Sequence, residues 1–272
     1  MPVLRSERRA SIERSSPYRR PRAAGAPSTP PGARELVERF VRWQQPHAWK
    51  QLEGVERLWA TSDLHVEHES NLAFLRGLDG YSEDGLIVAG DVCSSIALLR
   101  STMALLVGKF KHVFYCAGNH ELWHDPATDG ADSFGKLLAI YEMVTDLGAH
   151  AAPALLGAGG GAGPRLAVVP LQSWHHCNFL AGGPVADMPS DHPLRQMDGS
   201  CRWPAAVARC STSAGVARLF ARCNEELLRQ AVGTEEGAVA AARGHSIVSF
   251  SHFLPRPELH RTHPSALADR LG

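Results

Sequence analysis

The feature that most constrains this chain is a polar quartet, Gly118–Glu121, which follows directly on the apolar run Val113–Ala117. An apolar run of this length predicts a buried strand and places the quartet at the strand's carboxyl end. In open α/β sheets, ligands bind at this edge. An amide oxygen, an imidazole and a carboxylate at that edge can serve a metal or a phosphate. The same residues also suit a hydrogen-bonded turn with a solvated His and Glu.

Three more apolar runs of strand length also deliver metal-ligand residue types to their ends. They are Leu58–Ser62 before Asp63-Leu64-His65, Leu86–Ala89 before Gly90-Asp91, and Ile247–Ser251 before His252. We expect one central sheet to gather all four ends, because the carboxyl ends of neighbouring parallel strands share an edge. Gathered there, the Asp, His and Asn side chains form a metal site.

The segments between these runs have the apolar periodicity of amphipathic helices. The predicted helices cover Ala33–Trp43, Ser95–Phe110, Ser133–Leu147 and Val216–Leu228. Ser95 is placed as an N-cap, and Gly148 is placed to end a helix in the left-handed conformation. Strands that alternate with helices form βαβ units, so the fold class is α/β.

A run of Gly and Ala, residues 157–163, lies between the apolar stretches Ala152–Leu156 and Leu166–Leu171. We interpret it as the tip of a hairpin. The alternative is a phosphate-binding glycine loop, but no helix opens after the run to hold a phosphate at its N-terminus. The hairpin is therefore the prediction for this part of the chain.

Composition and charge exclude several classes of protein. The 272 residues have a formal net charge of zero, which removes the basic footprint of a nucleic-acid-binding protein. No apolar run is long enough to span a bilayer. The six cysteines show no paired spacing, which argues against a zinc ribbon or a disulfide framework. It also favours a reducing, intracellular compartment.

The N-terminal segment differs from the rest of the chain. Residues 1–33 are rich in Arg, Ser and Pro and contain almost nothing apolar to bury, which predicts a disordered basic segment before a domain at 34–272. Such a composition is also typical of organelle transit peptides, although Glu7 and Glu13 argue against one. We therefore expect a cytoplasmic protein, or one in the chloroplast or mitochondrion if the segment is a transit peptide.

Taken in order, Asp63-Leu64-His65, Gly90-Asp91, Gly118–Glu121 and His252 resemble the motifs of the calcineurin-like metallophosphoesterase superfamily. The flanking residues Ser62–His65, Val88–Asp91 and Ser249–Pro255 are similar to an uncharacterised plant and algal branch of it. The resemblance implies a four-layer α/β/β/α sandwich with two metal ions, Mn, Fe or Zn, between the carboxyl ends of the central strands.

The resemblance also implies a role for each site residue. The implied metal ligands are Asp63, His65 and Asp91 for the first ion, and Asp91, Asn119 and His252 for the second. Asp91 bridges the two ions, and His120 stabilises or protonates the leaving oxygen. Glu121 is implied as an orienting partner rather than a ligand.

Two residues are weaker candidates for contact with a substrate. They are Glu121, which belongs to the quartet, and His176, which lies at the start of a long loop of the kind that often lines a site. Trp123 can stack on a ring of a substrate, although rim or core packing is the general expectation for Trp.

The implied function is hydrolysis of a phosphomonoester or phosphodiester, with two metals activating water. The alternative is a non-catalytic scaffold that keeps the fold and binds a protein partner. Such scaffolds tend to lose ligands or the leaving-group histidine, whereas this chain keeps them all, so a hydrolase is the prediction. Neither nucleic-acid binding nor a membrane span is expected.

The sequence departs from the family pattern near its end. The superfamily closes its site with Gly-His-x-His, and nothing after His252 matches it. In Leu259–His263 the two histidines are three positions apart instead of two, and no apolar strand precedes them. We therefore expect the domain to be truncated at its C-terminus and the chain as given to have low activity.

Overall fold

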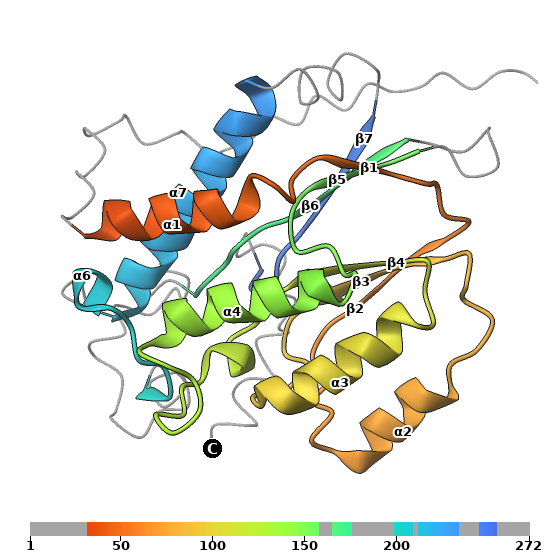
Figure 1. Cartoon of the computed structure of the whole chain (residues 1–272), viewed down its shortest axis with the longest axis horizontal. Helices are drawn as coiled ribbons and strands as arrows, with labels where there is room; N and C mark the ends of the chain where they lie inside the picture. Colours follow the sequence, from red (N-terminus) through yellow and green to blue (C-terminus); the bar gives the residue numbers. More distant parts are fainter. Residues whose placement is uncertain (1–31, 158–164, 176–198, 209–211, 234–244, 255–272) are drawn as a thin grey trace, which may run out of the picture.

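The computed structural model of the protein describes residues 32–157, 165–175, 199–208, 212–233 and 245–254, and shows a mixed α/β fold with two sheets (Figure 1). The N-terminal segment predicted to be disordered therefore lies outside the described residues, apart from Gly32 and Ala33. The tip of the predicted hairpin and the segment from 255 onward also lie outside them. No helix in the described ranges is long and apolar enough to cross a membrane.

The first sheet is parallel and has the strand order β2-β3-β4. Its strands are β2 (Leu58–Thr61), β3 (Gly85–Ala89) and β4 (His112–Cys116), connected through α2 (Glu69–Gly77) and α3 (Ile96–Val107). Successive residues of β3 point to opposite faces, and both faces are covered: Leu86 and Val88 pack among helices, whereas Ile87 packs toward the second sheet. This double burial explains why β3 and the residues of β4 after His112 are almost entirely apolar.

The second sheet has the strand order β1-β5-β6-β7. Its strands are β1 (Lys50–Leu52), β5 (Ala154–Leu156), β6 (Leu166–Pro170) and β7 (Ser246–Phe250). β5 and β6 pair antiparallel, as the predicted hairpin requires, and β7 pairs parallel to β6.

The expectation that one central sheet carries all four motif-bearing strands is wrong. β2, β3 and β4 share the first sheet, whereas β7 belongs to the second. The two sheets pack on each other through Ile87 and Phe114 on one side and Ala154, Leu156 and Val168 on the other. The strand ends meet because of this packing between sheets.

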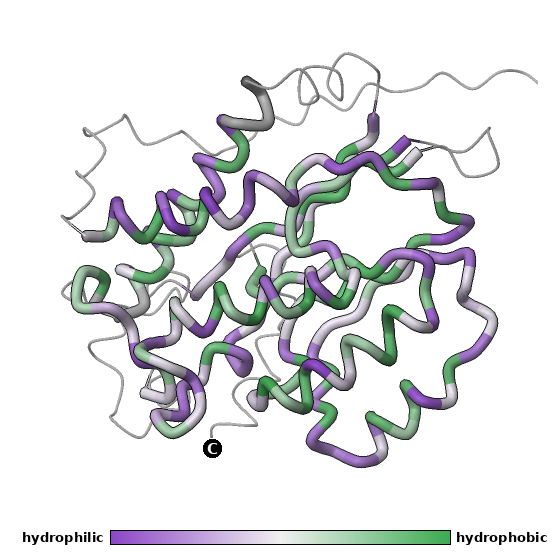
Figure 2. The backbone as a smooth tube through the Cα atoms, in the orientation of Figure 1, coloured by the Kyte–Doolittle hydropathy of each residue, from purple (hydrophilic) through white to green (hydrophobic). Residues whose placement is uncertain are grey.

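Helices complete the layers. α3 and α4 (Ser133–Asp146) pack on the outer face of the first sheet, and α1 (Ala33–Gln44) lies against α7 (Thr212–Gly233). α6 (Ala205–Ala208) and the 3-10 turn η1 (His120–Leu122) are short. Figure 2 shows the hydrophobic residues concentrated along α3 and the central strands.

The predicted ends of two helices are confirmed. The Ser95 hydroxyl accepts a hydrogen bond from the Leu98 N–H at 3.5 Å and caps α3. Gly148 has φ 98°, the left-handed conformation in which glycine carries no steric penalty.

Candidate metal centre

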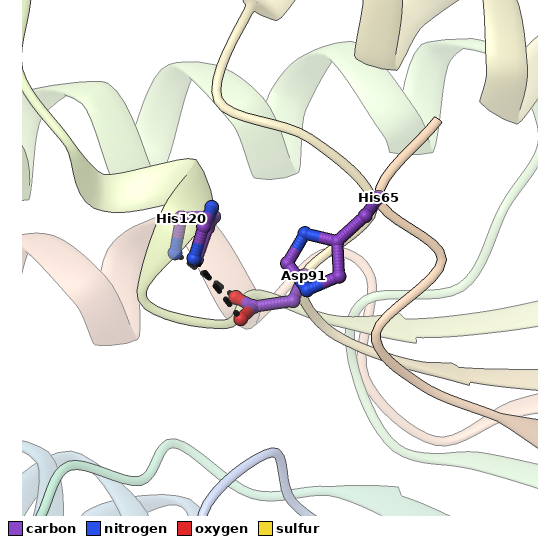
Figure 3. A group of neighbouring side chains, drawn as sticks. All are labelled: His65, Asp91 and His120. Atoms are coloured by element: carbon purple, nitrogen blue, oxygen red, sulfur yellow. Dashed lines mark hydrogen bonds and ion pairs between the residues drawn. The ribbon is translucent and has the colours of Figure 1, made fainter. Parts of the chain in front are cut away.

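The four strand ends bring Asp and His side chains within reach of common points in space. Ligand atoms lie within 4.8 Å of one another in two groups: His65, Asp91 and His120, and Asp63, Asp91 and His252. Asp91 belongs to both groups. Figure 3 shows the first group, in which His65 and His120 approach the Asp91 carboxylate from different segments.

Asp91 is buried at the centre of the site, with 3% of the residue exposed. Its Oδ1 accepts the backbone N–H of His120 at 2.9 Å. Its Oδ2 lies 3.4 Å from Nε2 of His252 and 3.9 Å from Nε2 of His120. Burial raises the pKa of Asp91, but the hydrogen bond and charge of His252 outweigh it and hold that pKa below its ordinary value. The side chain is therefore a carboxylate.

Both ring nitrogens of His252 face oxygen atoms that can accept a hydrogen bond. Its Nδ1 lies 2.9 Å from the carbonyl oxygen of Ala89, which can only accept, so Nδ1 carries a hydrogen. Its Nε2 then faces Asn119 Oδ1 at 3.1 Å and Asp91 Oδ2 at 3.4 Å. Burial lowers the pKa of His252, but Asp91 raises it above its ordinary value overall. An arrangement of this kind calls for a cation, either a proton on His252 or a metal ion among the three atoms.

The imidazoles of His65 and His120 are more exposed than that of His252. The rings of His65 and His120 meet edge to face with centroids 4.6 Å apart, and His65 Nε2 lies 3.9 Å from Asp63 Oδ1. Burial lowers the pKa of His120 in spite of the nearby Asp91. A neutral imidazole is the form that binds a metal, so the state of His120 suits ligation as well as hydrogen bonding.

Three candidate metal ligands have positive φ angles, which residues other than glycine rarely adopt. Asp63, His65 and Asp91 have φ values of 54°, 41° and 53°. Each costs on the order of 1–3 kcal/mol and persists only where the surroundings hold it. The surroundings here are paired backbone segments: the N–H groups of Asp63 and His65 donate to the carbonyls of Gly90 and Asp91 at 3.0 and 3.1 Å.

The approach of the loops after β3 and β4 depends on two glycines. A Cβ on Gly90 would lie 2.5 Å from the nitrogen of Gly118, and a Cβ on Gly118 would lie 2.1 Å from Asp91 Oδ1. Neither distance is possible for real atoms. The Gly90-Asp91 and Gly118-Asn119 motifs therefore use glycine because the two loops touch.

The carboxylate of Glu121 connects the same two loops by accepting hydrogen bonds from both. It is fully buried, and its Oε2 accepts the N–H groups of Asp91 and Gly118 at 2.9 and 2.7 Å. Its Oε1 accepts those of Val92 and Cys93 at 2.6 and 3.2 Å. Burial, with the charge of Asp91, raises the pKa of Glu121 to about 7, and the backbone N–H groups oppose this. Four donors with no other acceptor are matched by a carboxylate rather than by a carboxylic acid.

The predicted site residues have different outcomes. The structure brings together Asp63, His65, Asp91, Asn119, His120 and His252, although it groups them differently: His120 joins His65, and Asp63 joins His252. A contact between Glu121 and a substrate is contradicted, because its carboxylate is buried and occupied by backbone N–H groups. His176 and Leu259–His263 lie outside the described residues.

The sequence indicated Trp123 as a residue that can stack on a substrate ring, but its contact with His120 was not predicted. The Trp123 indole lies against the His120 imidazole with centroids 3.8 Å apart and an interplanar angle of 30°. Their spacing was a usable signal, because residues three apart on a 3-10 turn lie one above the other. His120 is therefore supported on one side by Trp123 and on the other by His65.

The donor chemistry fits transition-metal ions. The two groups offer carboxylate oxygens and imidazole nitrogens, with the neutral amide oxygen of Asn119 beside them. This set suits Mn, Fe or Zn better than a thiolate-preferring ion. The convergence of lone pairs at His252, Asn119 and Asp91 is the observation in this structure that such an ion explains.

Comparisons with known proteins agree with this arrangement. The family described as calcineurin-like phosphoesterase matches residues 56–174. A relative, the acyl-carrier-protein phosphodiesterase PptH of Mycobacterium tuberculosis (strain ATCC 25618 / H37Rv), is 35% identical over 133 residues, 46% of this chain. Those residues cover 40% of the relative, so the chain matches less than half of that protein's length.

A solved structure has the same fold. It is the crystal structure of phosphopantetheinyl hydrolase (PptH) from Mycobacterium tuberculosis, with a TM-score of 0.58 and 23% sequence identity. The superposition covers 78% of this chain and 74% of that one. The motifs from Asp63 to Glu121 lie inside the range 56–174, and this part of the chain is similar to calcineurin-like phosphoesterases.

Proposed function

We propose that this protein is a metal-dependent hydrolase of phosphate esters that uses two metal ions. The observation that carries the proposal is the convergence of two groups of ligand atoms on one shared carboxylate, Asp91. A bridging carboxylate holds two cations close together, and paired ions of this kind are used for in-line displacement at phosphorus.

The residues that would hold the ions follow from the contacts described above. Asp91 would serve both ions, with the remaining ligands drawn from Asp63, His65, Asn119 and His252. When bound, the ions supply Lewis acidity and a water of lowered pKa. In the reaction, a water oxygen bonds to phosphorus, the ester P–O bond breaks, and the departing alcohol oxygen takes a proton. We assign His120 to the side of the departing alcohol, because its imidazole is partly exposed and its ring is fixed by Trp123 and His65.

The first substrate class to test is a phosphodiester. The relative that is 35% identical over the matched segment is named as an acyl-carrier-protein phosphodiesterase. The family model matches residues 56–174, which include every strand-end motif except His252. We therefore propose phosphodiesters first, with phosphopantetheinyl-acyl carrier protein among them, and phosphomonoesters second.

The proposal is tested with purified protein stripped of metal. Addition of Mn²⁺, Fe²⁺ or Zn²⁺ should restore hydrolysis of bis(p-nitrophenyl) phosphate, p-nitrophenyl phosphate or phosphopantetheinyl-acyl carrier protein, and elemental analysis should find two equivalents of metal. Turnover that is unchanged by chelation would rule out a metal-dependent reaction. Stoichiometric metal binding with no turnover of any ester would favour the non-catalytic scaffold.

A substitution of His120 tests whether this residue acts in the reaction or holds a metal ion. In His120→Ala we expect turnover to fall by about 10²- to 10⁴-fold, the usual contribution of a positioned acid or base. Metal content should stay near that of wild type, because the other groups around Asp91 remain. The matched control is His68→Ala, an exposed histidine that precedes α2 and should behave as wild type. If His120→Ala lost metal in parallel with activity, His120 would be a ligand first.

A further inference from the structure

A cavity of about 820 Å³ has Trp123, the neighbour of His120, in its lining. Its lining includes Trp123, Ser94, Ser95, Ala97, Arg100 and Thr128. Trp123 borders both the cavity and the metal centre, because its ring also lies against the His120 imidazole, with the ring centroids 3.8 Å apart. A molecule in the cavity would therefore have Trp123 as a neighbour in common with His120. Its volume lies within the range of roughly 300–1,000 Å³ that is typical of small-molecule sites.

The walls of the cavity are held by a buried cation. Lys136 is 2% exposed, and its ammonium donates to the carbonyls of Ser94 and Trp123 at 3.0 and 2.5 Å. It also pairs with Asp129 at 2.8 Å. These contacts tie the loop after β3 to the loop after η1, one on each side of the cavity. The cavity is thus a built feature of the fold with fixed walls.

The charges around the cavity cancel. Its lining carries two basic side chains, Arg100 and Lys136, and two acidic ones, Asp125 and Asp129. Lys136 and Asp129 are buried and neutralise each other. Arg100 and Asp125 then remain, one of each sign, so the lining offers no net positive charge to a second phosphate and suits a neutral group. The rest of the lining includes Ile96, Ala97, Trp123 and His124 with several Ser and Thr residues, which suits a ring-bearing molecule with hydrogen-bonding groups.

We propose that this cavity binds the alcohol portion of the substrate, and that this portion is a neutral, polar, ring-bearing alcohol about the size of a nucleoside. The proposal rests on the proposed phosphoesterase function, because it assigns the phosphate to the centre around Asp91 and the departing alcohol to the cavity beyond His120. Trp123 then contacts both the group beside the reacting bond and the alcohol.

Filling the cavity tests the proposal. Ala97 is exposed on α3 and lines the cavity, and Ala104, two turns further along the same helix, is also exposed but does not line it. Ala97→Trp should therefore occupy the cavity, while Ala104→Trp makes the same substitution outside it. Both variants keep the metal centre intact and carry the same cost in helix propensity.

Binding is measured with adenosine as the probe, by saturation-transfer NMR on wild type and both variants. We expect adenosine affinity to fall by about tenfold or more in Ala97→Trp, as steric exclusion from a pocket commonly costs. Ala104→Trp should bind as wild type does. Failure of the wild type to bind adenosine, or undiminished binding by Ala97→Trp, overturns the inference.

Measurements of turnover then distinguish failure of the cavity proposal from failure of the proposed function. Adenosine 5′-monophosphate and methyl phosphate present the same phosphoryl group on a large and a small alcohol. We expect Ala97→Trp to lower kcat/KM for the first by about tenfold and to leave the second unchanged. Equal slowing of both esters overturns the inference and leaves the function standing. Ala97-dependent adenosine binding, without metal-dependent turnover of any ester, supports the binding site and overturns the function.

Discussion

Replacement of Asp91 by alanine is expected to abolish the binding of both metal ions. Its carboxylate belongs to both ligand clusters of the described residues, and Asp91 is the only residue that the two clusters share. Loss of a residue that only hydrogen-bonds to a metal ligand typically lowers metal affinity by about 10- to 100-fold. Loss of a ligand shared by both ions should therefore lower the affinity for each ion by at least about 100-fold. Elemental analysis after dialysis against Mn²⁺ should find two equivalents in wild type and close to none in Asp91→Ala.

The control for this prediction is Asp79→Ala. Asp79 is an exposed aspartate whose carboxylate accepts only its neighbour's N–H, from Gly80 at 2.8 Å. It should retain both ions, and circular dichroism should show that both variants keep the fold. Two equivalents of metal in Asp91→Ala would mean that Asp91 is not the bridging ligand.

Glu121→Gln should destabilise the fold and loosen the site while preserving side-chain volume. Gln keeps one acceptor oxygen and places an NH₂ group against two buried backbone N–H groups that Glu121 now satisfies. An unsatisfied buried donor costs about 1–3 kcal/mol, so the free energy of unfolding should fall by about 3 kcal/mol or more. Urea denaturation measures the loss directly.

The same variant should weaken metal binding in the folded protein. Glu121 accepts the N–H of Asp91, which has the strained φ of 53°, so the loop loses a restraint on its shared ligand. Glu67→Gln is the matched control, because Glu67 also accepts a backbone N–H of this loop, that of Ser94, but from an exposed position. Its stability should change by less than about 1 kcal/mol. Equal stability of wild type and Glu121→Gln would show that the buried carboxylate is not needed.

Periodicity alone predicted most of the strands and helices that position the site. β3 and β4 are buried on both faces, so apart from His112 at the start of β4 their sequences are almost entirely apolar, and the polar residues that follow mark where each strand ends. Ser95 and Gly148 were readable because capping chemistry is local. These features depend on neighbours in the sequence, which is why one sequence suffices to find them.

The features that were not predicted depend on contacts between distant segments. Nothing local to Ile247–Ser251 shows that its strand joins β6 rather than β3 or β4. The positive φ values of Asp63, His65 and Asp91 arise from backbone pairing between two loops, and non-glycine residues give no sign of them in the sequence. The stacking of Trp123 on His120 could be read only from their three-residue spacing, because the turn η1 is too short to show apolar periodicity.

The position of His252 also determines the order in which the site assembles during folding. The hydrogen bond from His252 Nδ1 to the carbonyl of Ala89 joins residues 163 positions apart in the chain, whereas His65, Asp91 and His120 lie within the single parallel sheet and its loops. Contacts with such a separation form late, because loop closure must precede the packing that rewards it. One cluster can therefore capture an ion while β7 is still undocked, and the other exists only after the sheets have packed. In refolding experiments, uptake of the second metal ion should coincide with the final cooperative step.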